Sequence, residues 1–193
     1  MADKQRKVVE SHRKRGVSKA EWLDAGLDAL SRGSVAEITI DHLARSLGIA
    51  KAGFYWHFRV REDLLHEMLD HWTHEVTEVV TKNAALLELE PRSRLISAAE
   101  MILDHDLGSL DMAIRLWAQR DPMAARAVRK VNKLRLAFAR EALEELGFKG
   151  DEAEMRAMVF VLYHALESSV FRQVSRKRRR ELIASRIEML TSR

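Results

Sequence analysis

The sequence predicts an all-α fold, in which a small N-terminal domain of three helices is followed by a larger helical domain. Only two of the 193 residues are proline and eight are glycine, so few residues interrupt the helices. Long stretches repeat their apolar residues at the helical period of 3.6, and none shows the sustained alternation of a half-buried strand. Capping residues mark the starts of several of these stretches and set the expected helix boundaries.

Three short helices are expected in the first part of the chain, over residues 18–33, 39–47 and 51–57. Ser18 opens a capping box with the glutamate three residues later, in which each side chain binds a backbone amide of the first turn. Thr39 can cap the second helix through its hydroxyl group. The spacing leaves only tight turns between these helices, as expected of a small three-helix domain.

The helices expected beyond residue 61 are longer. Pro91 and Gly108 interrupt the apolar periodicity of this region. Asp121 and Pro122 form a cap that is followed by proline at the first helical position, which is a strong signal for a helix start. The expected helices cover residues 62–81, 95–106, 110–120, 122–146, 151–174 and 181–190.

These elements predict three parts of the chain. Residues 1–17 are expected to be a disordered basic extension, residues 18–61 a three-helix domain, and residues 62–193 a helical domain whose first helix, 62–81, is the connector. Residues 1–61 hold 12 Lys and Arg against 7 Asp and Glu, whereas the rest of the chain holds 21 against 22. A basic N-terminal third is the sign expected of a surface that meets phosphates, although a solvated tail would explain the extension alone.

Composition and missing motifs exclude several classes of protein. The chain has no cysteine, which excludes disulfides and thiolate chemistry and fits the reducing cytoplasm. No signal-peptide core is visible, and the most apolar run, residues 157–163, is far too short to span a membrane. A nucleophile elbow, a phosphate-binding glycine loop and a HExxH motif are all absent. We therefore expect a cytoplasmic protein without enzymatic activity, cofactor or membrane contact.

One pair of histidines leaves an alternative open. His71 and His74 lie three residues apart on the expected connector, which is a spacing that can bind a metal. A solvated helix surface explains the pair more simply, so no metal site is predicted.

The most informative segment is residues 43–58, with the sequence LARSLGIAKAGFYWHF. A helix-turn-helix needs a small residue where its two helices cross and a residue that tolerates positive φ in the turn. Ala44 supplies the first, and Gly48, four positions later, supplies the second. An ordinary helical hairpin with a glycine turn would share these separate features. Their coincidence with apolar residues at the required offsets favours a helix-turn-helix; these residues are Leu43, Leu47, Ile49 and Phe54.

The stretch from residue 18 to about residue 72 resembles the N-terminal domain of the TetR family of transcriptional regulators. The resemblance rests on the helix start at residues 39–44, on the turn at residues 47–49 and above all on the sequence FYWHF at residues 54–58. Arg61 and the leucine pair that follows it resemble the start of the family's fourth helix. The rest of the chain resembles the family only in length and helix count.

The resemblance implies that the third helix is a recognition helix that contacts a double-stranded, palindromic operator. Its first residues would lie nearest the base edges, where Lys51 has the only long side chain that can bond guanine. Tyr55 and His57 would hydrogen-bond phosphates, and Trp56 would lie against the DNA backbone or a thymine methyl. Tyr55 and Trp56 can instead pack beneath the next helix. Thr39 and Arg61 would bind phosphates at the starts of the second and fourth helices. The implied DNA contacts are Thr39, Lys51, Ala52, Gly53, Tyr55, Trp56, His57 and Arg61.

The recognition helix departs from the family pattern at two positions. Ala50 stands where the family has a serine or threonine cap, which removes about 1 kcal/mol of capping. Gly53 lowers the helix propensity by about as much again. We therefore expect this helix to order fully only on DNA.

The resemblance implies that residues 82–193 bind a ligand and form the dimer. Methionine, aromatic and histidine side chains on these helices would surround a ligand cavity, although each can equally be ordinary core. Adaptable methionines favour an apolar or aromatic effector of unknown identity. The predicted ligand-pocket residues are Met101, His105, Trp117, Phe138, Phe160 and His164.

A homodimer is expected through the last two long helices, residues 151–174 and 177–191, which would form a four-helix bundle with their copies. The alternative is that the apolar face of the first of them packs within its own chain. This face consists of Met155, Met158, Val159, Leu162, Leu166 and Val170.

Two functions remain open at this point. The first is a sequence-specific DNA-binding regulator, a repressor that a small apolar or aromatic ligand releases from its operator. The second is a DNA-binding regulator or architectural protein without a small-molecule ligand. A cavity of several hundred cubic ångströms would favour the first, and a fully packed C-terminal domain would favour the second. The basic run at residues 176–180 has no assigned function.

Overall fold

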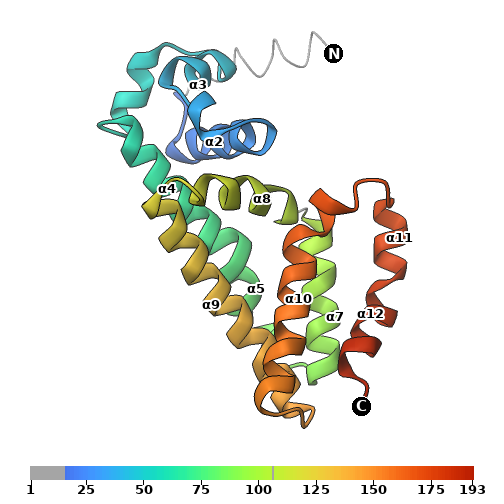
Figure 1. Cartoon of the computed structure of the whole chain (residues 1–193). Coiled ribbons are helices and arrows are strands. Elements are labelled where there is room, and N and C mark those ends of the chain that lie inside the picture. The colour runs from blue at the N-terminus through green and yellow to red at the C-terminus, as the bar shows by residue number, and fades with distance from the viewer. Residues whose placement is uncertain (1–15, 106) are drawn as a thin grey trace. The chain divides into compact units, whose positions relative to one another are not determined.

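The structure, a computed structural model, describes residues 16–105 and 107–193, apart from the side chains of Val76 and Ser109. All regular elements of these residues are helices, which confirms the predicted all-α class (Figure 1). The described chain forms two compact units, which meet between His71 and Trp72. Most of the extension predicted over residues 1–17 lies outside the described residues.

The first unit contains three short helices and the start of a longer one. Ser18 forms the predicted capping box, because its amide donates to Glu21 Oε2 at 2.7 Å and its Oγ accepts from the Glu21 amide at 3.3 Å. Thr39 Oγ1 accepts from the His42 amide at 3.1 Å and so caps the second helix as predicted. The elements of the unit are α2 (Lys19–Arg32), η1 (Val35–Glu37), α3 (Ile40–Ser46), η2 (Lys51–Trp56) and α4 (Arg61–Thr73).

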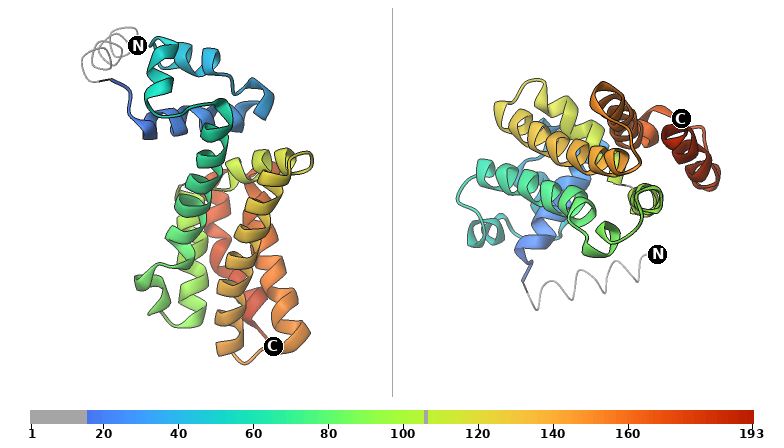
Figure 2. Two further views of the ribbon diagram at one scale, coloured as in Figure 1. Left: turned by 90° about the vertical axis from the view of Figure 1, so that its left-hand side faces the viewer. Right: turned by 90° about the horizontal axis from the view of Figure 1, so that it is seen from below.

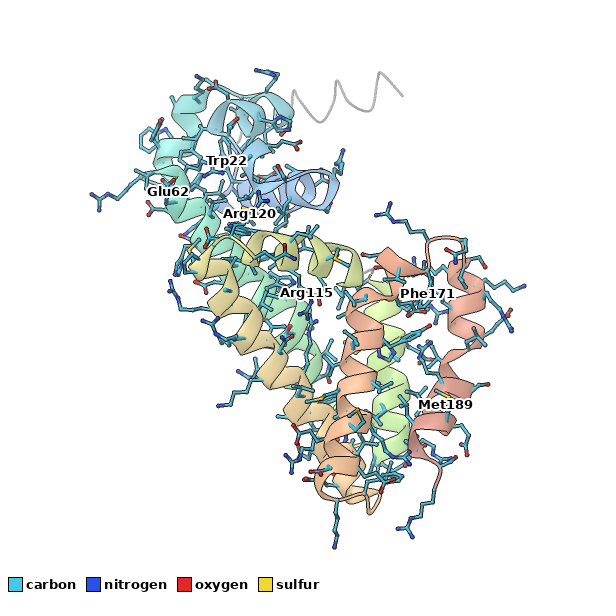
Figure 3. All side chains as sticks on the ribbon, viewed as in Figure 1. Trp22, Glu62, Arg115, Arg120, Phe171 and Met189 are labelled. Carbon is cyan, nitrogen blue, oxygen red and sulfur yellow. The ribbon has the colours of Figure 1, made fainter. Side chains whose placement is uncertain are left out.

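The core of the first unit forms around Trp22 (labelled in Figure 3). The Trp22 indole meets the Phe54 ring edge to face, with the ring centroids 5.3 Å apart. Phe58 packs on Phe54 at 5.1 Å between centroids. These fully buried rings, together with Leu43 of α3, fix η2 against α2 and α3. Burying each such ring contributes about 1.5–3 kcal/mol of stability.

The expected connector over residues 62–81 has three segments. α4 passes directly into η3 (His74–Glu78), a π-helical stretch, and then into α5 (Val79–Thr81). No proline or glycine marks this change, so it is invisible in the local sequence. A π-helical turn inside an α-helix is uncommon and frequently lies at a functional site.

The second unit is a bundle of helices (Figure 2). Helices α8, α9 and α10 pack on one another, and α7 packs between α9 and α12. One apolar core joins them. The helices are α6 (Ala84–Leu87), α7 (Pro91–Asp104), α8 (Leu107–Ala118), α9 (Pro122–Glu145), α10 (Gly150–Val170), α11 (Arg176–Glu181) and α12 (Ile183–Thr191).

Several predicted boundaries in this unit are wrong. Pro91 does not break a helix but occupies the first position of α7, which Glu90 caps by accepting the Ser93 amide at 2.6 Å. The hydrogen bond from the Ser93 hydroxyl holds the Glu90 pKa below its usual value. Gly108 lies inside α8 rather than between helices. The predicted final helices also differ, because α10 ends at Val170 and the last helix is divided into α11 and α12.

The two glycines of the helix-turn-helix motif should respond oppositely to alanine. Gly48 has a φ of +70°, so Gly48→Ala should destabilise the turn by about 1–2 kcal/mol. Gly53 has no positive φ, and an added Cβ would meet only the flexible end of Ile49 at 3.2 Å. Gly53→Ala should therefore stabilise η2 by up to about 1 kcal/mol.

Amide hydrogen exchange over α3 and η2 measures both effects in the intact chain. Protection should fall in Gly48→Ala and stay equal or rise in Gly53→Ala. Equal losses of protection in the two variants would refute the assignment of the turn to Gly48.

Candidate DNA-binding surface and ligand cavity

The turn of the helix-turn-helix motif is a compact helix end. The Leu47 amide donates to Leu43 O at 2.9 Å, and the Ile49 amide reaches back to Ala44 O at 3.0 Å. The second bond requires the left-handed conformation at Gly48 between them. Ala44 is buried, which allows the helices to cross closely as its size predicted. The turn therefore directs the chain into η2 only a few residues after α3 ends.

The recognition helix η2 adopts the tighter 3₁₀ form. The Gly53 amide donates to Ala50 O at 3.0 Å, and the His57 amide donates to Phe54 O at 2.9 Å, both with the i→i+3 spacing. No side chain caps its N-terminus, where Ala50 stands in the capping position. The absent cap and Gly53 both weaken an α-helix here, which agrees with the short, tight form.

The same short helix has one buried side and one exposed side. Phe54 is completely buried, whereas Tyr55 is 60% and Trp56 86% exposed. Trp56 therefore does not pack beneath the next helix in this structure, which was the alternative to a DNA contact. An apolar ring kept in solvent on a short helix is available to a partner.

Besides Arg61, three of the predicted DNA contacts already have protein partners. The Lys51 ammonium pairs with the Asp41 carboxylate, and both side chains are more than half exposed. The His57 Nε2 atom lies 2.7 Å from Val17 O, which ties the recognition helix to the segment that precedes α2. Thr39 caps α3 as described above. An exposed ion pair is worth little in water, so Lys51 can exchange Asp41 for another acceptor at small cost.

Arg61 has a structural contact in addition to its predicted role. Its Nε donates to Ile38 O and its Nη2 to Val35 O, each at 2.5 Å. These bonds satisfy carbonyl groups of the loop before α3. The guanidinium therefore positions the start of the motif, and its contact with phosphate stays a prediction.

The second unit contains a small, mostly apolar cavity. Its volume is about 30 Å³, enough for one or two water molecules. Of the predicted pocket residues, Phe138, Phe160 and His164 line it. Met101, His105 and Trp117 do not. The lining residues are Thr77, Val80, Thr81, Ala98, Ile102, Leu107, Gly108, Asp111, Arg135, Phe138, Phe160, Val161, His164 and Ala165.

The sequence did not indicate the charged residues that line this cavity, Asp111 and Arg135. Asp111 on α8 is completely buried and accepts two hydrogen bonds from Arg135 on α9, at 2.6 and 3.0 Å. Arg135 Nε also donates to Thr77 Oγ1 in the π-helical stretch at 3.2 Å. Arg115 (labelled in Figure 3) approaches the same carboxylate at 3.4 Å. The four side chains join α8, α9 and η3, and their sequence separations hid this pairing.

His164 on α10 lies in a second polar group of this unit. Its Nδ1 is 2.7 Å from Phe160 O, and its Nε2 is 3.1 Å from Arg186 Nη2 on α12. Because Arg186 can only donate, the ring is neutral, donates from Nδ1 and accepts at Nε2. Burial, followed by the positive charge of Arg186, lowers the His164 pKa to about 3. Tyr163 donates to Glu167 at 2.9 Å beside this group.

An apolar stripe on α10 is exposed in the single chain. Leu162 is 61% exposed, and most of the stripe predicted as a dimer face is likewise in contact with solvent. Leu166 is partly buried. The alternative, in which this face packs within its own chain, therefore does not describe most of the stripe. The exposed members are Met155, Met158, Val159, Leu162 and Val170, and Met189 of α12 (Figure 3) is exposed as well.

The basic run at residues 176–180 forms α11, and part of it has a structural role. Arg176 Nη2 donates to Asp104 O at 2.5 Å, and Arg180 forms an ion pair with the Asp104 side chain. Asp104 is the last residue of α7, whose C-terminus attracts cations. The two arginines therefore fasten α11 to the end of α7, a role that no feature of the sequence indicated.

The described residues hold no group of three or more potential metal ligands. His71 lies 3.9 Å from Asp24, and His74 lies beside Glu75 and Glu78 on its own helix. Their surroundings are those of a surface with mixed charges.

None of the described helices is long and apolar enough to cross a membrane.

Comparison with known proteins confirms the resemblance deduced from the motif. Residues 23–68 match the family model of the bacterial regulatory proteins of the tetR family. A transcriptional regulator from Rhodococcus sp. Rha1 has a similar structure, with a TM-score of 0.71, 16% identity and coverage of 90% of this chain and 96% of that one. The structure of FadR from Bacillus subtilis, in complex with stearoyl-CoA, has a TM-score of 0.68 and 16% identity. The match covers 91% of this chain and 98% of that one. At these identities the structures show a shared fold. No curated protein is a sequence match.

The buried imidazole should make the stability depend on pH. Because the His164 pKa is lowered from 6.5 to about 3, the unfolded chain takes up a proton below pH 6.5 that the folded chain does not. The stability due to this group is therefore complete above pH 6.5 and is lost as the pH falls toward 3. Between pH 6.5 and 4.5 the loss should reach about 2–3 kcal/mol.

Urea unfolding of the parent protein and of His164→Gln across this range measures the contribution. Glutamine keeps a donor and an acceptor but does not titrate, and the other groups titrate alike in both proteins. The parent should lose more stability on acidification than His164→Gln. Parallel pH profiles would show that the imidazole is not held neutral by the fold.

Proposed function

We propose that this chain is a TetR-family repressor, which binds a palindromic operator as a dimer and leaves it when a small ligand binds. The main support for DNA binding is that the recognition helix has one buried and one exposed side. Phe54 anchors η2 in the core, while Tyr55 and Trp56 stand in solvent beside it. Such a helix presents aromatic and polar groups on its exposed side, as docking in a major groove requires.

Base reading is assigned to Lys51. It lies at the start of η2, and among the described residues it pairs with the exposed carboxylate of Asp41. Replacing this weak pair with guanine O6 or N7 would gain a specific contact at small cost. Asp41 then holds the ammonium near the required position before DNA arrives.

Dimerisation is assigned to the exposed stripe of α10. One short recognition helix makes few base contacts, so useful affinity requires two half-sites. The stripe follows helical spacing along α10 with Leu162 near its middle. Its exposed apolar side chains would be covered by the same stripe of a second copy, as in a symmetric four-helix interface.

Ligand control is assigned to the cavity of the second unit. A similar structure, that of FadR, holds stearoyl-CoA, so this fold can accommodate a ligand. The cavity borders Thr77 and Val80, which lie in and after the π-helical stretch of the connector. A ligand that enlarges the cavity would displace this stretch. It would change operator affinity only through its different affinities for the two shapes of the dimer.

The size of the cavity also favours a second candidate function, regulation without a small-molecule ligand. A space of about 30 Å³ is far below the several hundred cubic ångströms of ordinary ligand sites. In the ligand-controlled case the cavity must therefore open before a ligand can enter. The two candidates share the operator and the dimer and differ only in the effector.

Removal of the proposed base contact should relax specificity. Lys51→Ala should weaken operator binding by about 1–3 kcal/mol and should lower non-specific binding much less. Lys133→Ala, a lysine on α9 that is exposed as well, is the matched control. Fluorescence anisotropy with operator and scrambled duplexes, at several salt concentrations, separates the two effects. If Lys51→Ala leaves the ratio of the two affinities unchanged, Lys51 does not read a base.

A charge in the apolar stripe should prevent dimerisation. Leu162→Glu should yield folded monomers, because the dimer would bury an unpaired carboxylate at its centre. Leu116→Glu alters a leucine on α8 that is similarly exposed but outside the stripe, and it should leave the dimer intact. Sedimentation velocity measures both. A Leu162→Glu dimer of unchanged affinity would exclude this face as the interface.

A further inference from the structure

The lining of the cavity combines polar and apolar side chains. Thr77, Asp111 and His164 are buried and Arg135 is partly buried; these four are called the polar end. Most of the remaining lining is apolar and comes from α5, α7, α8, α9 and α10; among its members are Val80, Ala98, Ile102, Phe138 and Phe160. A molecule that satisfies both kinds of lining carries one polar group on an apolar body.

The carboxylate of Asp111 faces two guanidinium groups, those of Arg135 and Arg115. Arg135 lines the cavity, whereas Arg115 does not and its side chain is 25% exposed. The Arg115 contact is long, at 3.4 Å, and its Nη2 is held at 2.8 Å by the neutral Asn132. Counted over these three side chains, one positive charge has no carboxylate partner.

Arg135 also keeps hydrogen-bond donors that Asp111 and Thr77 do not use. A guanidinium carries five N–H bonds, and three of those on Arg135 are used by Asp111 and Thr77. Both nitrogens of His164 are engaged, one by Phe160 O and one by Arg186. The remaining capacity therefore suits an acceptor, and an anionic acceptor makes the stronger bond with a guanidinium.

The pKa of the His164 imidazole also reflects the positive charges near the cavity. Burial is the main reason that the His164 pKa is low, but the charges of Arg186 and Arg135 lower it further. Burial opposes a charge of either sign, but the two arginine charges favour an anion. Around His164, Arg186 is balanced by Glu167, whose Oε1 lies 3.8 Å from Arg186 Nη1, and Tyr163 donates to the same carboxylate.

We propose that the effector is a small apolar carboxylate, whose carboxyl group binds Arg135 and whose hydrocarbon part lies along Val80, Ala98 and Phe138. This inference rests on the ligand-controlled function proposed above and names the ligand's chemical class. The carboxylate binds the unused N–H bonds of Arg135 and draws that side chain toward itself and away from Thr77. Binding therefore loosens the bond that holds Arg135 to the π-helical stretch.

The small cavity determines how such a ligand acts. Because the present space is about 30 Å³, the carboxylate binds only a form in which the surrounding helices have separated. Gly108 allows the close approach of α8 to α10, since a Cβ there would lie 3.1 Å from His164 O. Closure of these two helices opposes the ligand, and its entry shifts the population toward the expanded form.

Three matched probes test the proposal: octanoate, octan-1-ol and octylamine share one chain and differ in charge. Titration calorimetry with the full chain at pH 7.5 should give octanoate at least tenfold tighter binding than octanol, and octylamine the weakest. Tenfold corresponds to about 1.4 kcal/mol. In the double variant Asp111→Asn with Arg135→Gln, which keeps neutral hydrogen-bonding groups, octanoate should lose its advantage while octanol still binds.

Ala98→Leu provides the control for location, because Ala98 is completely buried and lines the cavity. It should abolish binding of all three probes in a protein whose circular dichroism is unchanged. Octanoate that binds Ala98→Leu normally is held elsewhere, for example on the exposed stripe, and this result would overturn the proposal.

The outcomes separate this inference from the proposed function. Equal affinities for the three probes would overturn the carboxylate class and leave an apolar effector in place. Absence of binding by every probe would overturn the inference as well. Release of the operator duplex by octanoate in the parent, but not in Ala98→Leu, would support both. Operator binding itself is measured without any probe. The DNA-binding function is therefore tested independently of the carboxylate proposal.

Discussion

The buried pair of Asp111 and Arg135 is the interaction on which the second unit depends. It joins α8 to α9, and through Thr77 it fixes the π-helical stretch of the connector. The Arg135 guanidinium also lies over the Trp72 ring, 5.8 Å from its centroid. Loss of one partner from a buried pair costs about 3–5 kcal/mol, because the other charge is left without compensation. A ligand that draws Arg135 away from Thr77 would act on the connector directly.

In the first unit one short helix is divided between core and solvent. The edge-to-face contact of Trp22 and Phe54 holds the recognition helix on its buried side. The neighbouring Trp56 is left in solvent, although its burial would add stability. This arrangement gives up stability on one side of η2 in exchange for an exposed aromatic surface. Neighbouring residues of one short segment therefore serve the core, as Phe54 does, and the exposed surface, as Trp56 does.

Local signals predicted much of the fold, and long-range ones were missed. Ser18, Thr39 and Gly48 act within a few residues of themselves, so their capping and turn roles were readable in the sequence. The Asp111–Arg135 pair spans 24 residues and two helices, and no periodic pattern records it. For the same reason three predicted pocket residues line the cavity and three do not. Whole-helix periodicity identifies a buried face but not which cavity the face adjoins.

We propose that the chain reads DNA sequence through two recognition helices at once. Selection of bound duplexes from a random library by the full-length protein, followed by sequencing, tests this proposal. We expect an inverted repeat whose half-sites are about one helical turn, or a multiple of it, apart. Enrichment of no sequence, or of isolated half-sites alone, would show that two recognition helices do not read DNA together.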